Sequence, residues 1–186
     1  MRIFDCFMFY DEEAVLDIRL NSLKNSVDCF VIVESKFYHN GKKRELKFNI
    51  DNFPKFKDKI IYIVQDEESL DLETVEKEDD EGTKSYKFIS NAHKRENFQR
   101  NLISKGLVKS NEDDLIMISD VDEIPNLKDL NVAKVNNKIV IFKQNIFYYK
   151  LNRYLEGFTW HGTKACKKKN LKSPQWIRNV KNKKFS

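Results

Sequence analysis

Four apolar runs of strand length place the strongest limit on how this 186-residue chain can fold. They are residues 2–9, 27–35, 59–66 and 114–119. Continuous apolar runs, rather than alternating apolar and polar residues, are typical of strands buried on both faces of a sheet. Two amphipathic segments, 11–26 and 90–107, interrupt the series and predict helices. This order indicates an α/β fold with a mostly parallel central sheet and helices on both faces.

The ends of both predicted helices carry recognisable signals. The first helix has acidic residues in its opening turn, where the helix dipole favours them. Its apolar side consists of Val15, Leu16, Ile18, Leu20 and Leu23. In the second helix, Ser90 or Asn91 is placed to cap the first turn, and Gly106 is placed to end the helix. The apolar segment 138–151 predicts one or two further strands.

The composition predicts one ordered domain spanning residues 1–186. Hydrophobic residues make up 40% of the chain, which at this length is enough to bury a sizeable core. The net charge of +5 is unevenly distributed, with an acidic surface insert at 66–85 and a basic segment at 164–184. Such runs are usually solvated surface or disorder. The functional alternative for the basic segment is attraction of phosphate-bearing ligands or peripheral contact with an anionic membrane, and no nucleic acid partner is expected.

The cysteines and the N-terminal residues indicate the cellular compartment in which the protein is expected. Cys6, Cys29 and Cys166 have no metal-ligand spacing, and an odd number of thiols favours buried side chains in a reducing environment. Acidic residues occur within the first dozen positions, and the chain has no long apolar run. These features predict neither a signal peptide nor a membrane-spanning helix, and hence a cytoplasmic protein.

Polar side chains stand at the ends of the four predicted strands. Tyr10 follows the first strand, Glu34 lies at the end of the second, and Asp66 ends the third. Asp120 and Asp122 follow the fourth. In open α/β sheets, ligands bind outside the carboxyl ends of the strands. The alignment of polar and acidic residues there predicts a ligand site.

The Asp-Val-Asp sequence at 120–122 is the most informative part of that site. Residues two apart on an extended segment project to the same side, so both carboxylates can face one point. Mn²⁺ or Mg²⁺ would relieve their repulsion, taking one or two protein carboxylates and filling its other positions with phosphate and water. The expected ligand is a metal–diphosphate complex. The alternative is that both acids only cap a loop, and Glu123 is interpreted as a turn residue.

Arg100, inside the second predicted helix, has two interpretations. Glu96 lies four residues earlier, so a solvated ion pair on one helix face explains the spacing. Alternatively, Arg100 reaches the diphosphate beside the metal, since a guanidinium group matches phosphate oxygens. The spacing alone does not separate these interpretations.

Several segments together resemble glycosyltransferase family 17. The most specific are "VES" at 33–35, "QRN" at 99–101 and "SDVDEIP" at 119–125, in this order. The opening residues 2–35 and "GKKRELKF" also match, and the aromatic segment that begins at Phe147 fits less closely. The resemblance covers most of the chain and is weakest across the acidic insert.

The resemblance implies a GT-A type nucleotide-sugar-binding fold. It implies an inverting, Mn²⁺- or Mg²⁺-assisted transfer of a sugar, expected to be GlcNAc, from a UDP-sugar to a glycan or glycolipid acceptor. By position, Asp122 would contact the metal most directly, and Asp120 the ribose or a metal-bound water. Glu34 would face the uridine and Arg100 the diphosphate, with Tyr10 also in the donor site.

Candidates on the acceptor side come from single residues. Glu156 is the only acid between positions 150 and 186, which makes it a candidate for the base that deprotonates the acceptor hydroxyl. Trp160 could stack on an acceptor sugar, with core packing as the alternative. The histidines lack ligand spacing, so surface or hydrogen-bonded roles are expected. They are His39, His93 and His161.

Departures from the family pattern keep two other functions open. Family members continue past the aromatic segment with a Gly-Trp-His-containing stretch that this sequence lacks, so a C-terminally truncated domain could bind nucleotide or glycan without turnover. The animal members are anchored in the secretory pathway, so an unanchored enzyme of bacterial or viral type is expected here. A haloacid-dehalogenase-type phosphohydrolase also uses Asp-x-Asp after a buried strand, but with Thr or Val where Ile124 stands, and nearer the N-terminus.

Overall fold

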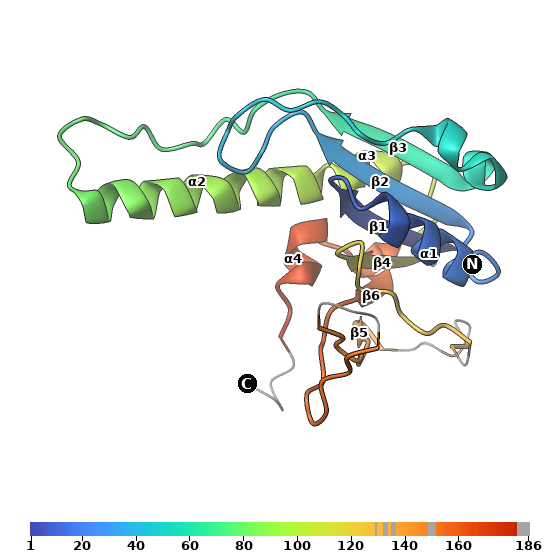
Figure 1. Ribbon diagram of the computed structural model, residues 1–186. Coiled ribbons are helices and arrows are strands. Elements are labelled where there is room, and N and C mark those ends of the chain that lie inside the picture. Colours follow the sequence, from blue (N-terminus) through green and yellow to red (C-terminus); the bar gives the residue numbers. More distant parts are fainter. Residues whose placement is uncertain (129, 132–133, 135–136, 149–151, 182–186) are drawn as a thin grey trace.

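A six-stranded sheet in the order β3-β2-β1-β4-β6-β5 forms the centre of the molecule (Figure 1). The strands are β1 (Ile3–Phe9), β2 (Cys29–Ser35), β3 (Ile60–Gln65), β4 (Leu115–Ser119), β5 (Val140–Ile141) and β6 (Lys164–Lys167). The structure is a computed structural model, which describes residues 1–128, 130–131, 134, 137–148 and 152–181. β1 pairs in parallel with β2 and β4, and β2 pairs in parallel with β3. β6 pairs antiparallel with β4 and β5, so the sheet is mixed.

The predicted α/β class is confirmed, and each of the four apolar runs contains one of the strands β1 to β4. Segment 138–151 contains β5. In its described part, the remaining pairing consists of isolated antiparallel bridges, from Gln144 to Trp160 and from Phe147 to Tyr154. Strand β6 was not expected, because its residues lie inside the basic segment.

The basic segment contains β6 and the short helix α4 (Pro174–Arg178). The prediction of solvated or disordered chain is therefore wrong for most of the part that the structure describes. Ala165 and Cys166 are buried beside β4, and Ile177 of α4 is fully buried. These few apolar residues decide the structure of the segment, although lysines outnumber them in the sequence.

Helix α2 (Glu81–Asn101) begins well before the predicted start. Asp80 caps it, because its carboxylate accepts a hydrogen bond from the Thr83 amide at 2.7 Å. Ser90 and Asn91, the expected caps, are interior helix residues, so this prediction is wrong. None of the helices in the described part of the chain combines the length and apolar character needed to cross a membrane.

The acidic loop at 66–80 lies beside α2 (Figure 1). Ion pairs join its acids to basic residues of the helix. The pairs are Lys87–Asp79, Lys94–Glu73 and Arg95–Glu68. Part of the negative charge that marked this insert in the sequence is therefore balanced by α2, and residues 81–85 of the insert belong to the helix itself.

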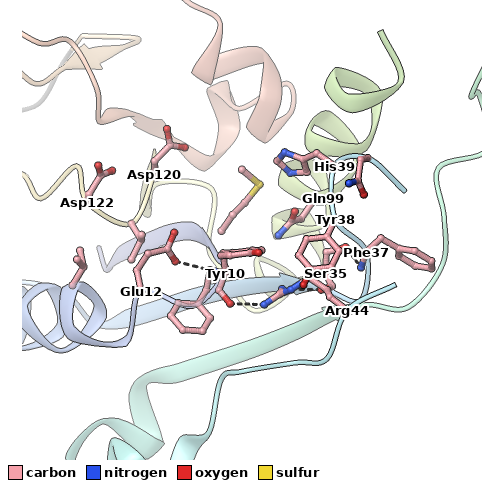
Figure 2. Close-up of a pocket in the computed structure, with 15 residues that line it drawn as sticks. Tyr10, Glu12, Ser35, Phe37, Tyr38, His39, Arg44, Gln99, Asp120 and Asp122 are labelled. Carbon is pink, nitrogen blue, oxygen red and sulfur yellow. Dashed lines mark hydrogen bonds between the residues drawn. The ribbon is translucent and has the colours of Figure 1, made fainter. Parts of the chain in front are cut away.

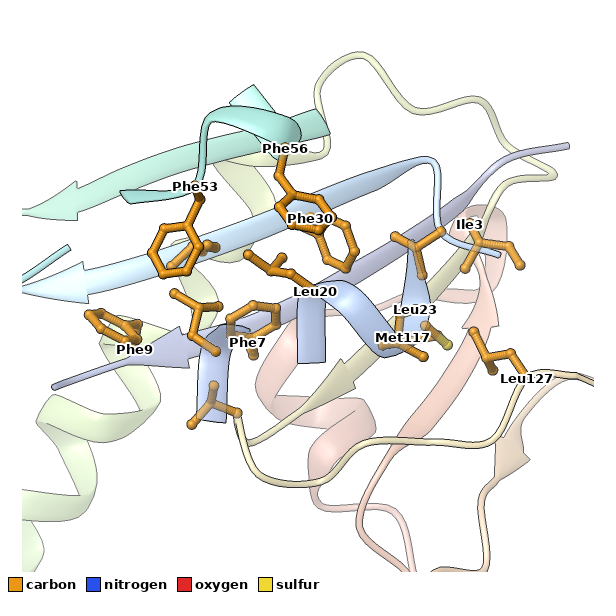
Figure 3. Close-up of a cluster of buried hydrophobic side chains, with 14 of the residues drawn as sticks. Ile3, Phe7, Phe9, Leu20, Leu23, Phe30, Phe53, Phe56, Met117 and Leu127 are labelled. Atoms are coloured by element: carbon orange, nitrogen blue, oxygen red, sulfur yellow. The ribbon is translucent and has the colours of Figure 1, made fainter. Parts of the chain in front are cut away.

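Alternate side chains of the central strands pack on opposite faces of the sheet. One face is covered by helix α1 (Glu13–Leu23) and by the 3-10 helix η2 (Pro54–Lys59) (Figure 3). Its buried residues include Phe7, Phe9, Phe30, Met117, Leu16, Leu20, Leu23 and Phe56. The other face packs against α4 and the short helix α3 (Ile103–Gly106), with Phe4, Cys6, Val31, Ile116, Ile103 and Ile177 among its buried residues. Helices therefore cover both faces, and the helical segment ends at Gly106, as predicted.

The apolar side of α1 differs from the prediction at one position. Leu16, Leu20 and Leu23 are buried, and Val15 is partly buried, whereas Ile18 is 43% exposed. Arg19 is fully buried instead. Position 19 lies three residues after Leu16 and is therefore on the face that meets the sheet, whereas position 18 lies beside that face.

The cysteines are free thiols. Cys6 and Cys166 are buried, as expected, and Cys29 is half-buried. Burial raises the pKa of the Cys6 thiol well above its usual value and raises the pKa of Cys166 to about 11. Both thiols therefore stay protonated at neutral pH.

Gly106 allows α3 to approach the sheet closely. A Cβ atom at this position would lie 2.5 Å from Val31 Cγ1 and 3.1 Å from Ile63 Cδ1. We expect Gly106→Ala to lower the free energy of unfolding by about 1–3 kcal/mol, because the helix must move away from a packed core. Gly82→Ala, in the exposed first turn of α2, is the matched control and should change stability by about 1 kcal/mol or less. Equal values from urea unfolding of the two variants would contradict this account.

Candidate functional site

The order of the strands reverses between β1 and β4. After β1, the chain adds β2 and β3 on one side, and it later adds β4 on the other side. Ligands of open α/β sheets bind at such a point, outside the carboxyl ends of the strands. A cavity of about 700 Å³ opens there, lined by residues that end β1, β2 and β4 (Figure 2). Tyr10, Asp120 and Asp122 are among its lining residues, as the sequence predicted for a ligand site at this edge.

The cavity has an acidic end and an aromatic end. Figure 2 shows Asp120 and Asp122 on one side, and Tyr38 and His39 on the other. The segment after Asp120 is a turn, in which the Glu123 amide donates to the Asp120 carbonyl oxygen at 3.1 Å, rather than the extended chain that was expected. Both aspartates nevertheless contribute to the same cavity wall.

Both carboxylate oxygens of Asp120 accept hydrogen bonds from arginines. Arg100 of α2 donates to Oδ1 at 3.1 Å, and Arg178 of α4 donates to Oδ2 at 2.6 Å. Arg100 also pairs with Glu96 at 2.9 Å, which is the ion pair that their spacing indicates. Arg100 is buried and lies outside the cavity lining. The structure thus joins Arg100 to Asp120, and its contact with a diphosphate stays a prediction.

Asp122 is the more accessible member of the pair. Within the described residues, no ion pair involves its carboxylate. Partial desolvation by the cavity wall raises the pKa of Asp122, and the negative charges of Glu123 and Asp120 raise it further. A cation beside Asp122 would relieve this repulsion and would favour the ionised carboxylate.

Glu123 is buried and holds the turn together, in agreement with its interpretation as a turn residue. Its Oε2 atom accepts from the Asp120 amide at 2.9 Å, and Arg178 donates to each of its carboxylate oxygens at 2.9 Å. Trp160 Nε1 donates to Oε1 at 2.7 Å. These bonds fix the Glu123 carboxylate inside the protein, so it is not free to bind a ligand.

Arg19 supports the same turn from the protein interior. Its guanidinium forms a two-point contact with buried Asp5, at 2.8 and 2.6 Å, and donates to Ser119 Oγ at 2.6 Å. Its Nη1 atom donates to three backbone carbonyl groups of the turn. The acceptors are the carbonyl oxygens of Asp120 and Val121 at 3.0 Å and of Glu123 at 3.2 Å. A buried ion pair on β1 and α1 therefore positions the acidic end of the cavity.

The aromatic end is organised around Arg44. Its guanidinium lies 4.3 Å from the ring centroid of Tyr10 and 5.9 Å from that of Tyr38, which is within the range of cation–π contact. It also donates to the carbonyl oxygens of Ser35 and Tyr10. Tyr10 is 42% exposed, so one aromatic residue at this end presents open surface to the cavity.

Glu34 lies outside the cavity lining, although it ends β2 within the matching "VES" segment. Its buried carboxylate accepts from the Lys47 and Phe48 amides at 2.7 and 3.0 Å and from the Tyr62 hydroxyl at 2.8 Å. It also pairs with Arg44 at 3.1 Å. Glu34 thus holds the loop that carries Arg44 against the sheet, and direct contact with uridine stays a prediction.

Other expected site residues also lie outside the lining. Glu156 is in an exposed turn, and Trp160 is 41% exposed and bonded to Glu123. Asp66 is exposed after β3. Of the histidines, His39 is a lining residue. The cavity lining therefore contains Tyr10, Asp120 and Asp122. Outside it lie Glu34, Glu156 and Trp160, and also Arg100, which is bonded to Asp120.

The acidic end is chemically suited to a hard divalent cation. The described residues contain no group of three or more His, Cys, Asp or Glu side chains that could hold a metal ion by themselves. Mg²⁺ commonly binds through one or two carboxylates plus substrate phosphates and waters, so a single available carboxylate on the rim of an open cavity fits this mode. Asp122 would be the direct ligand, because arginines already bind both oxygens of Asp120.

Three arginines that shape the site were missed from the sequence. For Arg19 a signal was present, because it lies on the apolar side of a helix, and Asp5 interrupts an apolar strand. Arg44 lies in the segment "GKKRELKF" that matches the family, but nothing in that segment singled it out as a site residue. Arg178 was one cation among many in the basic segment. Only the fold brings these residues to the cavity.

Comparison with known protein families gave one match. The model described as Glycosyltransferase family 17 matches residues 1–176. The matched region includes β1 to β6, all lining residues of the cavity, and the Asp120–Asp122 turn. Comparisons with curated proteins and with solved structures gave no match.

Proposed function

The chain belongs to glycosyltransferase family 17, and on this basis we propose that it transfers N-acetylglucosamine from a UDP-sugar to a glycan, with inversion and with help from Mn²⁺ or Mg²⁺. Membership of the family supports glycosyl transfer as the general activity. The identities of the nucleotide donor, the transferred sugar and the assisting metal ion are what we propose beyond that activity. The observation that supports it best is a single cavity with carboxylates at one end and aromatic rings at the other.

The two ends suit the two parts of a nucleotide-sugar. Tyr10 and Tyr38 offer aromatic surface for stacking on a base, and the Arg44 guanidinium packs against both rings. The diphosphate would then lie toward Asp122. Ligand sites combine a largely apolar lining with a few placed polar groups in this way.

The metal, when bound, supplies positive charge to the diphosphate as it leaves with the nucleotide. Asp122 would hold it in place. Arg100 and Arg178 neutralise Asp120 at the same end, which prevents a second uncompensated carboxylate from opposing the diphosphate. Arg19 keeps this end of the cavity fixed, so that little reorganisation accompanies the transfer.

The acceptor hydroxyl needs a base as it attacks the sugar. Glu12 lines the cavity, and its Oε2 accepts from the Tyr10 and Asp11 amides at 3.0 and 3.1 Å. Glu156, which the sequence suggested, is outside the lining. We therefore assign the base to Glu12 in this proposal, since a general base must lie within reach of the reacting hydroxyl.

The proposal is tested by thermal unfolding and by turnover. UDP with Mn²⁺, at about a hundredfold excess over Kd, should raise Tm by roughly 5–10 °C. UDP-GlcNAc should release UDP in the presence of Mn²⁺. Chelation of the metal with EDTA should remove most of both effects.

The same measurements separate the alternatives. A UDP-dependent shift without UDP release under any acceptor condition would favour a binding module over an enzyme. Hydrolysis of a phosphate monoester without any response to UDP would favour a phosphohydrolase, although the two arginines on Asp120 already argue against its use as a nucleophile. GDP serves as the matched nucleotide control and should give a smaller shift than UDP.

A further inference from the structure

Residues 142–148 and 152–160 form an arm with an unusual exposed surface, named here the aromatic arm. Five large hydrophobic side chains of the arm are between 41% and 51% exposed, and all five are aromatic. They are Phe147, Tyr148, Tyr154, Phe158 and Trp160. Elsewhere in the described chain, the exposed large hydrophobic residues include aliphatic ones such as Leu70, Ile89 and Val108. The arm is therefore enriched in one chemical type, flat rings, rather than in apolar surface generally.

Backbone bonds give the arm a hairpin-like shape. Gln144 and Trp160 form a bridge, with amide-to-carbonyl distances of 2.8 and 2.9 Å. Farther out, Phe147 pairs with Tyr154, and their ring centroids are 5.8 Å apart. The rings thus stand on a paired backbone, which limits the conformational entropy lost when a ligand binds them.

The base of the arm is fixed to the acidic end of the cavity. Trp160 Nε1 donates to Glu123 Oε1 at 2.7 Å, and Thr163 Oγ1 donates to the Glu123 carbonyl oxygen at 2.7 Å. Gly162 makes this approach possible, since a Cβ atom there would lie 2.5 Å from Glu123 Cδ and 2.6 Å from Trp160 Nε1. Glu123 also binds the Asp120 amide. The base of the arm is therefore bonded, through Glu123, to the turn that carries Asp120 and Asp122.

We propose that the aromatic arm binds the acceptor glycan, an inference that rests on the function proposed above. The C–H face of a sugar ring packs on an aromatic face, while its hydroxyls need hydrogen-bond partners at the ring edge. The arm supplies both, because exposed Asn145, Asn152 and Arg153 lie between its aromatic residues. A transferase must hold its acceptor beside the donor. The bond between Trp160 and Glu123 fixes the base of the arm to the acidic end of the donor cavity.

The test is binding of the full chain to an array of immobilised neutral oligosaccharides, including β-linked GlcNAc and α-linked mannose oligomers. Phe158→Ala should weaken binding by roughly tenfold, as for removal of an aromatic contact at an interface. Phe88→Ala is the matched control, because Phe88 is an exposed phenylalanine on α2, outside the arm, and should bind like the unaltered chain. Trp160→Phe keeps a ring but removes the bond to Glu123, and should lower transfer more than glycan binding.

Three outcomes would overturn the assignment. The first is an array without any bound oligosaccharide, and the second is an equal loss of binding in the Phe158 and Phe88 variants. The third is that the chain binds phosphatidylcholine or phosphatidylserine vesicles, and that Phe158→Ala abolishes this vesicle binding but leaves glycan binding unchanged. That result would identify the arm as a membrane contact. The UDP and Mn²⁺ shift in Tm is measured on the same variants. If Phe158→Ala keeps the Tm shift but loses glycan binding, the acceptor surface is separate from the donor site. If the unaltered chain shows no Tm shift, only the donor proposal is refuted.

Discussion

Replacing Arg19 with methionine is expected to lower the free energy of unfolding by about 3–5 kcal/mol. The substitution leaves the Asp5 carboxylate buried without its cation and removes hydrogen bonds to Ser119 and to the carbonyl oxygens of the turn. Both Arg19 and Asp5 are fully buried, so water cannot replace the lost partner without opening the core. Urea unfolding monitored by tryptophan fluorescence and by circular dichroism measures the loss.

Neighbouring substitutions separate this effect from a general weakening of α1. Ile18→Ala changes an exposed residue of the same helix and should alter stability by about 0.5 kcal/mol or less. The double variant Asp5→Leu with Arg19→Met removes the unpaired charge and should recover part of the loss. A double variant as unstable as the sum of its single variants would mean that the two groups do not interact.

Replacing Asp122 with asparagine is expected to reduce transfer by at least roughly a hundredfold, because the proposed metal loses its ionised ligand. Stability should be retained or raised. Partial desolvation and then the charges of Glu123 and Asp120 raise the pKa of Asp122, so its ionised form is unfavourable in the folded protein, and the neutral amide removes that cost. The Mn²⁺-dependent part of the UDP shift in Tm should disappear.

Two other aspartates provide the controls for this result. Asp120→Asn weakens its ion pairs with Arg100 and Arg178, so it should lower Tm as well as transfer. Asp113→Asn changes an exposed acid whose ion pairs with Lys167 and Lys169 lie at the protein surface, and it should leave both unchanged. Loss of transfer without loss of the Mn²⁺ effect in Asp122→Asn would remove this residue from the metal site.

The pH dependence gives an independent signature of Asp122. A protonated carboxyl does not bind the metal, so the Mn²⁺ effect should fall as pH decreases through the pKa of Asp122. Because that pKa is raised above the ordinary value of 3.8, the fall should begin at a higher pH than for an ordinary aspartate. A profile that stays flat down to pH 4 would contradict this expectation.

Much of the central sheet and the position of the cavity could be predicted from the sequence. The apolar runs that became β1, β2 and β4 are buried on both faces, which is the arrangement that leaves the clearest pattern in a single chain, and the edge strand β3 is partly buried. The placement of Tyr10, Asp120 and Asp122 at one edge followed from parallel pairing alone. Local rules sufficed because each of these residues is adjacent to the end of its own strand.

The remainder depended on contacts between distant segments. β6 and α4 are short and lysine-rich, and only pairing with β4 and burial of Ile177 stabilise them. Some contacts of Glu34 and Arg100 were missed for the same reason. Glu34 accepts from the Lys47 amide, and Arg100 shares Asp120 with Arg178, and no local spacing rule links these residues. The residue type indicated the charge and length of each side chain, but not which partner it would bind in the folded protein.

The pairing of loop 66–80 with α2 has a consequence for how firmly the first turns of that helix are held. Figure 1 shows these turns extending away from the sheet, beside the loop. The contacts between these turns and the loop include the Lys87–Asp79 and Lys94–Glu73 ion pairs. Dissolved salt screens such ion pairs, whereas it has little effect on the packed core. High ionic strength will therefore fray the first turns of α2 at salt concentrations that leave the sheet intact. The backbone amides of these turns should then exchange with solvent faster than those of the sheet.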